Sequence, residues 1–147
     1  FVKKMRQQTG QQILDKNRDY QRMLEIMAAK GKLGLVGDQN AGPRGLFVPF
    51  LNRPASTYKS IALLSLEYSA PIMVLGFARI ASPMRYLLIA EDWILPEEYA
   101  NRPDAVRAIT ERYSAALEAM VRRYPEQYFW VHRRWKDQPK TALKKAA

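Results

Sequence analysis

The sequence contains no cysteine and a single histidine, His132, and these two shortages limit its chemistry. Without cysteine, disulfide bonds, thiolate nucleophiles and thiolate metal ligands are all excluded. With one histidine, a multi-histidine metal site is excluded, and no cluster of carboxylates stands in its place. We therefore expect neither a metal ion nor a cofactor.

Long apolar runs are also missing. No stretch reaches the roughly 18 uninterrupted apolar residues of a membrane-spanning helix. The most apolar stretch, residues 69–82, is shorter and predicts a buried strand. Residues 1–10 include basic side chains without the apolar segment of a signal peptide. Because the sequence does not begin with methionine, we expect it to be a piece of a longer polypeptide.

The net charge of +10 is concentrated at the two ends of the 147-residue chain. Residues 1–32 contribute +5 and residues 121–147 contribute +6, whereas residues 33–120 contribute −1. Basic ends suit an anionic partner, such as phosphate, an acidic protein or a membrane surface. The alternative for any single lysine or arginine is a solvated surface position.

Apolar periodicity predicts three helices, at about residues 16–32, 53–70 and 103–123. Asp19 is placed to cap the first helix, and Gly31 is expected to end it in a left-handed conformation. In the second helix the cap is expected to be Ser56 or Thr57, and in the third Pro103 suits the first turn.

Short apolar runs predict the strands. Residues 33–37 and 71–80 are expected to be buried strands, with residues 85–90 as a neighbour of the second. Pro49 keeps residues 46–52 from forming a regular central strand. Helices alternating with strands predict an α/β fold, with a mixed sheet flanked by helices.

The segment 37–57, GDQNAGPRGLFVPFLNRPAST, has more glycine, proline and turn-forming residues than an ordinary connection. It resembles a conserved segment of the bacterial lipid A biosynthesis acyltransferases. The matching positions are Asp38, Gln39, Gly42, Gly45, Val48, Pro49, Phe50, Pro54 and Ala55. Asn52 stands where the family has glycine, and asparagine is the residue next best able to hold a positive φ.

Two further segments carry the resemblance. Residues 69–79, SAPIMVLGFAR, are similar to a family strand that ends near an arginine, and YPEQYFWVHRRWKDQP, residues 124–139, is similar to the family's C-terminal signature. The resemblance implies that residues 1–139 are the C-terminal part of one acyltransferase domain with a glycerolipid-acyltransferase-like fold. Residues 140–147 are expected to be a frayed basic tail.

The pair His132 and Asp137 has the His-x4-Asp spacing of the general base in this class of acyltransferases. In the family, however, the catalytic pair lies upstream of the Asp-Gln loop, and the segment around His132 ends the domain. On a helix, a separation of five residues also turns two side chains roughly 140° apart. We therefore expect no catalytic residue in this chain, and His132 is expected to pack with Trp130 in the core and to bond the loop.

The resemblance implies an enzyme that moves a fatty acyl chain from an acyl carrier protein thioester, or acyl-CoA, to a hydroxyl of a lipid A precursor or a related glycolipid. It implies a location at the cytoplasmic face of the bacterial inner membrane. This chain alone is expected to be inactive. The alternative is a non-catalytic basic module that binds an anionic partner; no nucleic-acid-binding signature is present, so nucleic acid is not the expected partner.

Two groups of residues are predicted to contact these partners. The residues expected to bind substrate are Asp38, Gln39, Asn40, Gly42, Arg44, Arg6 and Arg79. The residues expected to dock on the membrane or the acyl carrier protein are Arg133, Arg134, Trp135 and Lys136. For Asp38 the alternative is a local capping role, and for the arginines it is solvation at the surface.

Overall fold

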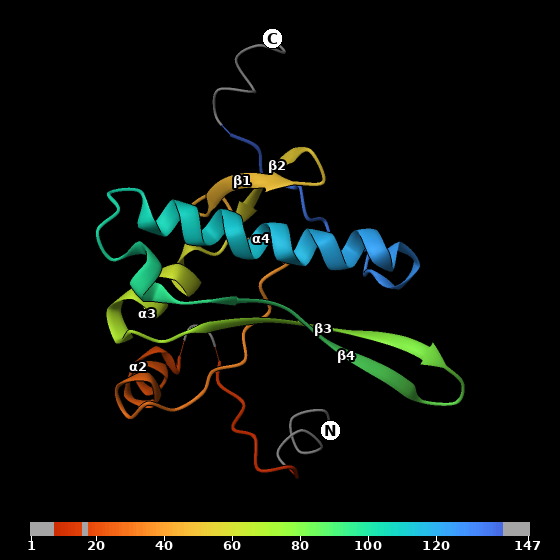
Figure 1. Cartoon of the computed structure of the whole chain (residues 1–147), viewed down its shortest axis with the longest axis horizontal. Coiled ribbons are helices and arrows are strands. Elements are labelled where there is room, and N and C mark those ends of the chain that lie inside the picture. Colours follow the sequence, from red (N-terminus) through yellow and green to blue (C-terminus); the bar gives the residue numbers. More distant parts are fainter. Residues whose placement is uncertain (1–7, 16–17, 140–147) are drawn as a thin grey trace. The chain divides into compact units, whose positions relative to one another are not determined.

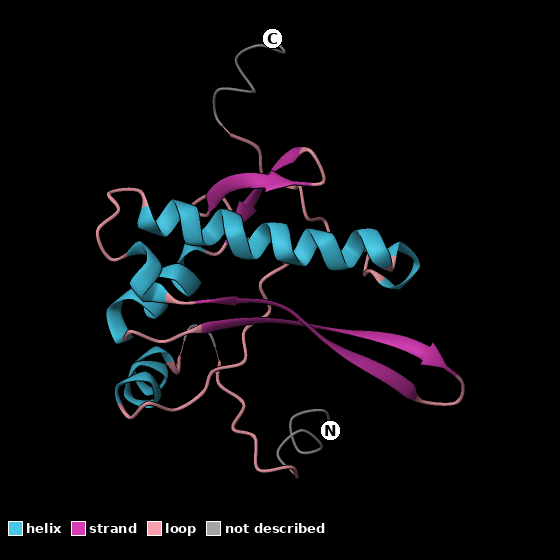
Figure 2. Cartoon of the chain, in the orientation of Figure 1, coloured by secondary structure: helices cyan, strands magenta, loops and turns pink. Residues whose placement is uncertain are grey.

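The computed structural model describes residues 8–15 and 18–139, and it divides the chain into two compact units, Phe1–Gly34 and Leu35–Ala147. The predicted tail at residues 140–147 lies outside the described residues. Helices and strands both occur, which confirms the α/β class (Figure 2). The described strands pair as two separate antiparallel hairpins, so the single mixed sheet that the sequence suggested is not found among them.

The first unit contains helix α2, Tyr20–Ala28. Asp19 precedes this helix as predicted, but its side chain makes no capping hydrogen bond to it. At the other end Lys30, with φ of 58°, holds the left-handed conformation that was expected of Gly31. The Gly31 N–H donates to the carbonyl of Ile26 at 2.8 Å, which leaves no room for a Cβ at position 31.

In the second unit the first hairpin joins β1, Leu46–Phe50, to β2, Arg53–Thr57. Leu51 and Asn52 form its two-residue turn with φ of 51° and 61°, which corresponds to a type I′ turn. The expectation that Asn52 holds a positive φ is confirmed. Pro49 is tolerated because a two-stranded sheet has only edge strands.

Helix α3, Lys59–Tyr68, begins later than predicted. The expected caps Ser56 and Thr57 belong instead to β2, and the residue before the helix is Tyr58. Both hydroxyls are fully buried, which explains the error, because small polar residues mark a buried, hydrogen-bonded strand here as readily as a helix cap.

Helix α4, Ala105–Arg123, lies between the two hairpins and supplies most of the core (Figure 1). It starts two residues after the predicted Pro103 and ends at the predicted Arg123. Its apolar positions recur at helical spacing, and the buried ones are Ala105, Ile109, Tyr113, Ala116, Met120 and Val121. The helix that was predicted from this periodicity is therefore confirmed.

The second hairpin pairs β3, Ile72–Ala81, with β4, Arg85–Ile94, as predicted. Its face toward α4 is closely packed, and a Cβ at Gly76 would overlap the side chain of Met120. Its other face is exposed; for example, Phe77 keeps 71% of its surface. The expectation of a wholly buried strand is therefore wrong. Two short 3₁₀ turns, η1 at Pro96–Tyr99 and η2 at Pro125–Gln127, flank α4.

The apolar run at residues 33–37 does not form the predicted strand. Leu35 and Val36 remain 49% and 64% exposed. Within the described part of the chain no strand pairs with this run, and an extended segment without a hydrogen-bonding neighbour does not become a strand.

Arg112 of α4 connects this helix to β4 and η1. Its Nε and Nη2 donate to both carboxylate oxygens of Asp92, at 2.8 and 2.9 Å, and its Nη1 donates to Glu98 at 2.6 Å. The same guanidinium also reaches the Tyr99 hydroxyl at 3.1 Å. These bonds lower the pKa of Asp92 below its ordinary value, chiefly through the hydrogen bonds from Arg112, and raise that of Arg112.

The lowered pKa of Asp92 predicts an acid-sensitive contribution to stability. The contribution is present above the unfolded pKa of 3.8 and is lost as pH falls through the lower folded value. We expect Asp92→Asn to cost about 1 kcal/mol at neutral pH, because the pair is partly solvated, and progressively less as the pH falls below 3.8. Urea unfolding at neutral pH and at a series of acidic pH values measures this. Asp104→Asn, which removes a half-exposed partner of Arg102, is the control; an equal effect of both substitutions would contradict the assignment.

The type I′ turn predicts opposite effects of two substitutions at one position. Asn52→Gly is expected to raise stability by a few tenths of a kcal/mol, and Asn52→Ala to lower it by about 1 kcal/mol, because only glycine and asparagine hold φ near 60° without strain. Thermal melts of the two variants test this order. A reversed order would show that the turn has another geometry.

Candidate functional site

The loop at residues 38–45 carries most of the predicted substrate-binding residues, and its own hydrogen bonds close it. The N–H of Gly42, which has a φ of 78°, donates to Asn40 Oδ1 at 3.3 Å. The N–H of Gly45 donates to the carbonyl of Gly42 at 3.2 Å. Neither glycine N–H group is free to bind an anion, because both are already bonded. What the glycines provide is close packing and a left-handed turn.

Strand β2 holds the same loop from one side. The Ala41 N–H donates to the carbonyl of Ser56 at 3.1 Å, and the Ser56 hydroxyl donates to the carbonyl of Gly42. A Cβ at Gly45 would overlap the Ser56 side chain, so glycine is required where the loop meets the strand. The loop is therefore fixed to β2 along its backbone.

The C-terminal segment, residues 124–139, holds the loop from the other side, at Asn40. The Asn40 N–H donates to His132 Nε2 at 2.8 Å, and its Nδ2 donates to Asp137 Oδ2 at 2.6 Å. The Tyr58 hydroxyl also donates to the Asn40 carbonyl, at 3.3 Å. The segment around His132 is not helical, so the expectation that His132 and Asp137 diverge is wrong. Both side chains reach one residue of the loop.

This geometry bears on the role of His132. A general base needs a free imidazole lone pair toward its substrate and a carboxylate that orients the other ring nitrogen. Here the Nε2 lone pair accepts the Asn40 N–H, and the Asp137 carboxylate accepts from the Asn40 amide. The two side chains therefore act together on Asn40. The expectation that His132 bonds the loop is confirmed, whereas Trp130, 50% exposed, does not join the core.

Arg134 lies beneath the loop and is only 1% exposed. Its Nη1 donates to the carbonyls of Gln39, at 3.3 Å, and Ser56, and its Nη2 donates to Thr57 Oγ1 at 2.7 Å. The guanidinium lies 5.1 Å from the centre of the Phe50 ring. Burial lowers the pKa of Arg134 from its ordinary value. A side chain this deeply buried cannot dock on a membrane or a carrier protein, so that prediction is wrong for Arg134.

The other predicted docking residues divide into two kinds. Arg133 and Lys136 are exposed, as docking would require. Trp135 instead packs its ring 6.0 Å from that of Phe50 in a small core cluster and is covered by Arg53, whose guanidinium carbon lies 5.1 Å from the ring centre. Residues 132–136 thus contain both anchoring and solvated positions, and the composition of the segment does not show which residue is of which kind.

A mostly apolar groove of about 320 Å³ lies beside the loop. Its walls come from residues 35–38, from β3 and β4, and from α4 together with the turn after it, and they include Leu75, Phe77, Leu117 and Met120. Asp38 and Tyr128 add polar groups to this lining. The Tyr128 hydroxyl donates to the Asp38 carbonyl at 3.4 Å, and burial raises the pKa of Tyr128 to about 12. Tyr128 therefore stays neutral at physiological pH, and sequence analysis did not single it out.

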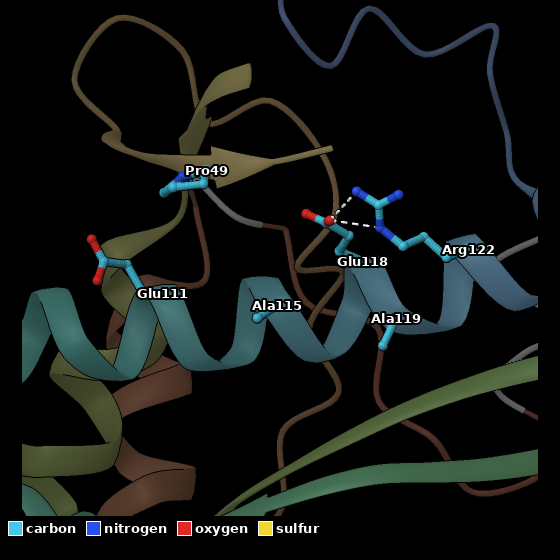
Figure 3. A pocket seen from close by; sticks show the side chains of 6 residues that line it. All are labelled: Pro49, Glu111, Ala115, Glu118, Ala119 and Arg122. Carbon is cyan, nitrogen blue, oxygen red and sulfur yellow. Dashed lines mark hydrogen bonds and ion pairs between the residues drawn. The ribbon is translucent and has the colours of Figure 1, made fainter. Parts of the chain in front are cut away.

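A second hollow lies on the opposite side of α4, between Glu111 and Arg122 (Figure 3). Its polar side chains already serve the fold. Glu118 accepts the Leu51 N–H at 2.7 Å and pairs with Arg122 at 2.6 Å, as the dashed lines in Figure 3 indicate for the ion pair. Glu118 therefore supports the β1–β2 turn, and neither of its carboxylate oxygens is free to bind a ligand in this hollow.

The predicted substrate-binding residues are only partly brought together. Gln39, Asn40 and Gly42 form the anchored loop, and Asp38 lines the groove. Arg44 is exposed on the same loop. Arg79 lies farther along β3 and does not line the groove; its backbone N–H donates to Gln127 Oε1 at 2.7 Å. Arg6 lies outside the described residues.

The anchoring bonds predict how the loop responds to substitution. His132→Ala is expected to speed hydrogen exchange at the Asn40 amide by about tenfold, because the N–H loses its acceptor. The exposed neighbour Arg133→Ala is the matched control and should leave this rate unchanged. Equal rates in both variants would show that the bond does not hold the loop.

Arg134 allows a second test of the same anchor. Arg134→Met keeps much of the volume but removes the donors to Gln39, Ser56 and Thr57, and we expect a loss of about 3 kcal/mol in the free energy of unfolding. Urea unfolding measures it. A variant as stable as the unsubstituted chain would exclude Arg134 as the anchor.

No curated protein matches the chain. The family model described as bacterial lipid A biosynthesis acyltransferase matches residues 1–137, which include the anchored loop, the groove and the C-terminal segment through Asp137. The chain therefore belongs to the bacterial lipid A biosynthesis acyltransferase family.

Proposed function

We propose that this chain forms the substrate-binding part of an acyltransferase that transfers a fatty acyl chain from an acyl carrier protein thioester to a hydroxyl of a lipid A precursor. Membership of the family supports acyl transfer in lipid A biosynthesis. The observation that carries the finer proposal is the apolar groove, because it lies directly beside the anchored loop and has Asp38 in its lining.

The groove suits an acyl chain. Its walls are mostly Leu, Met, Phe, Ile and Val side chains, and a fatty chain gains about 0.8 kcal/mol for each methylene group removed from water. Asp38 and Tyr128 give the lining a polar part, which suits the end of the acyl chain that carries the thioester. The acyl carbonyl would then lie beside the loop.

The reaction requires a base that this chain does not provide. An acceptor hydroxyl attacks the thioester carbonyl carbon, and its proton passes to the base. When the carbon–sulfur bond breaks, the base gives this proton to the sulfur and the carrier leaves as a thiol. His132 has its Nε2 occupied by Asn40, so the base is assigned to the family's upstream His-x4-Asp/Glu pair. The residues of this chain bind and orient, and their rigidity keeps the acyl carbonyl in position.

The acceptor is a phosphorylated glycolipid, and Arg44 is the residue proposed to bind it. Arg44 is exposed on the loop, and among the described residues it makes no hydrogen bond or ion pair. A planar guanidinium binds phosphate in a bidentate manner. We place the enzyme at the cytoplasmic face of the inner membrane, where such an acceptor lies. The described residues contain no helix that is both long and apolar enough to span a membrane.

The test is thioester consumption and acylated product, measured for this chain and for a form extended to the natural N-terminus. We expect product from the extended form alone. In that form, Arg44→Gln should raise the KM for a phosphorylated acceptor by about tenfold and leave the KM for the dephosphorylated acceptor unchanged. Arg107→Gln, another exposed arginine, is the control. Activity of the short chain that is lost in His132→Ala would contradict this assignment.

The alternative is a non-catalytic basic module, which the arginines and lysines near both ends of the sequence would support. The same experiment separates the two functions. If the extended form binds anionic partners but makes no acylated product with any donor thioester, the binding module is the better interpretation.

A further inference from the structure

The tip of the β3–β4 hairpin exposes apolar side chains on both of its faces. Phe77 and Leu88 are paired on the face opposite to that of the buried Ala78 and are 71% and 55% exposed; Phe77 also contributes to the lining of the groove. Leu87 is paired with Ala78, which is buried on the opposite face, and yet it is 44% exposed. At the turn Ile80 and Met84 are 56% and 74% exposed. The hairpin diverges from α4 toward this turn (Figure 1).

A second apolar segment is tied to the same hairpin. Phe129, Trp130 and Val131 are consecutive and are 68%, 50% and 81% exposed. Gln127 connects their segment to β3, since it accepts from the Arg79 N–H at 2.7 Å and donates to the Arg79 carbonyl at 3.2 Å. Three exposed apolar residues in a row are unusual in a water-soluble surface unless they bind something.

Trp130 is held in a defined position within this segment. Its Nε1 donates to the carbonyl of Pro125 at 2.6 Å, and its ring meets that of Tyr128 edge to face at 4.9 Å. Its polar atom is therefore satisfied within the protein, and the rest of the indole is free to contact an apolar medium.

Within both segments the charged side chains have one sign. Between Ala70 and Ala90 the only charged residues are Arg79 and Arg85, and no carboxylate occurs between Gln127 and Lys136. Arginine among apolar and aromatic residues is the composition of surfaces that enter the interface of an anionic bilayer, where the rings lie at headgroup level and the cations reach phosphate.

We propose that the hairpin tip and residues 129–131 together insert into the surface of a bilayer that contains anionic lipids. A protein partner that covers one face of the hairpin would leave the other face in water, whereas a lipid layer surrounds both faces and the turn. This inference rests on the proposed function only in that an enzyme with a lipid acceptor must reach the bilayer.

The first test is flotation of the chain with vesicles of phosphatidylcholine alone or mixed with phosphatidylglycerol. We expect binding to the mixed vesicles, and about tenfold weaker binding for the double variant Ile80→Ser, Met84→Ser. Leu63→Ser, which removes a 44% exposed leucine from α3, is the matched control and should bind as the unsubstituted chain does. The double variant Arg79→Gln, Arg85→Gln should lose the preference for phosphatidylglycerol.

The absence of cysteine provides a second test that does not depend on weakening the protein. A single thiol introduced as Met84→Cys or Val131→Cys accepts an environment-sensitive fluorophore. We expect its emission to shift to the blue on mixed vesicles and to be quenched by lipids brominated in their acyl chains, whereas a label at Leu63→Cys stays in water.

Three results would overturn the inference: no binding to mixed vesicles, labels at positions 84 and 131 that remain in water, or protection of those labels by dimer formation without lipid. None of these results would affect acyl transfer to a detergent-dispersed acceptor by the extended form. Conversely, vesicle binding without any transfer would count against the proposed function and leave this inference intact.

Discussion

The buried guanidinium of Arg134 is the interaction on which the candidate site depends. It joins the loop, through the Gln39 carbonyl, to β2, through Ser56 and Thr57, in a place that water does not reach. Among the described residues, no carboxylate forms a hydrogen bond or ion pair with Arg134, and its Nε is buried without a hydrogen bond. The negative charge of Asp38, a nearby carboxylate, favours the protonated guanidinium from a greater distance. A buried cation satisfied mainly by carbonyl oxygens is costly to form and fixes the position of the backbone that solvates it.

Around this cation, residues of the C-terminal segment and of α4 hold the loop in place. His132 and Asp137 position Asn40, and Tyr128 contacts the carbonyl of Asp38. Tyr113 of α4 donates its hydroxyl to the carbonyl of Tyr58 at 2.8 Å, and Tyr58 in turn donates to the Asn40 carbonyl. The rigidity of the loop is therefore linked to the core of the second unit, and the groove is built on the same helix.

The parts of the fold that sequence analysis predicted are those with a strong local signal. The core face of α4 follows the helical period, the pairing of β3 with β4 follows from adjacent apolar runs, and Asn52 marks its own turn. Ser56 and Thr57 were misassigned because the acceptors and donors that bury them come from distant residues. The run at residues 33–37 was misassigned because a strand depends on a partner, which the run itself does not encode.

For the site, the resemblance pointed to the loop and to the segment around His132, which the structure brings together, but it did not predict the roles of several side chains. Arg133 and Arg134 are adjacent and chemically identical, yet one is exposed and the other almost fully buried. His132 and Asp137 were expected to diverge because a helix was assumed, and the irregular backbone brings both to Asn40. Contacts between residues 77 to 97 positions apart decide these roles, and no local pattern reports them.

The same distant contacts set the order in which the site can form during synthesis. Asn40 meets His132 and Asp137 across 92 and 97 positions of the chain. A ribosome adds roughly 5 to 20 residues each second, so the loop leaves the exit tunnel several seconds before the side chains that hold it. Throughout that interval the backbone carbonyls that Arg134 will bind lack their donor. The nascent chain therefore passes through a stage in which the β1–β2 hairpin can close while the binding site is still incomplete, and the emergence of Asp137 from the tunnel is the event that completes it.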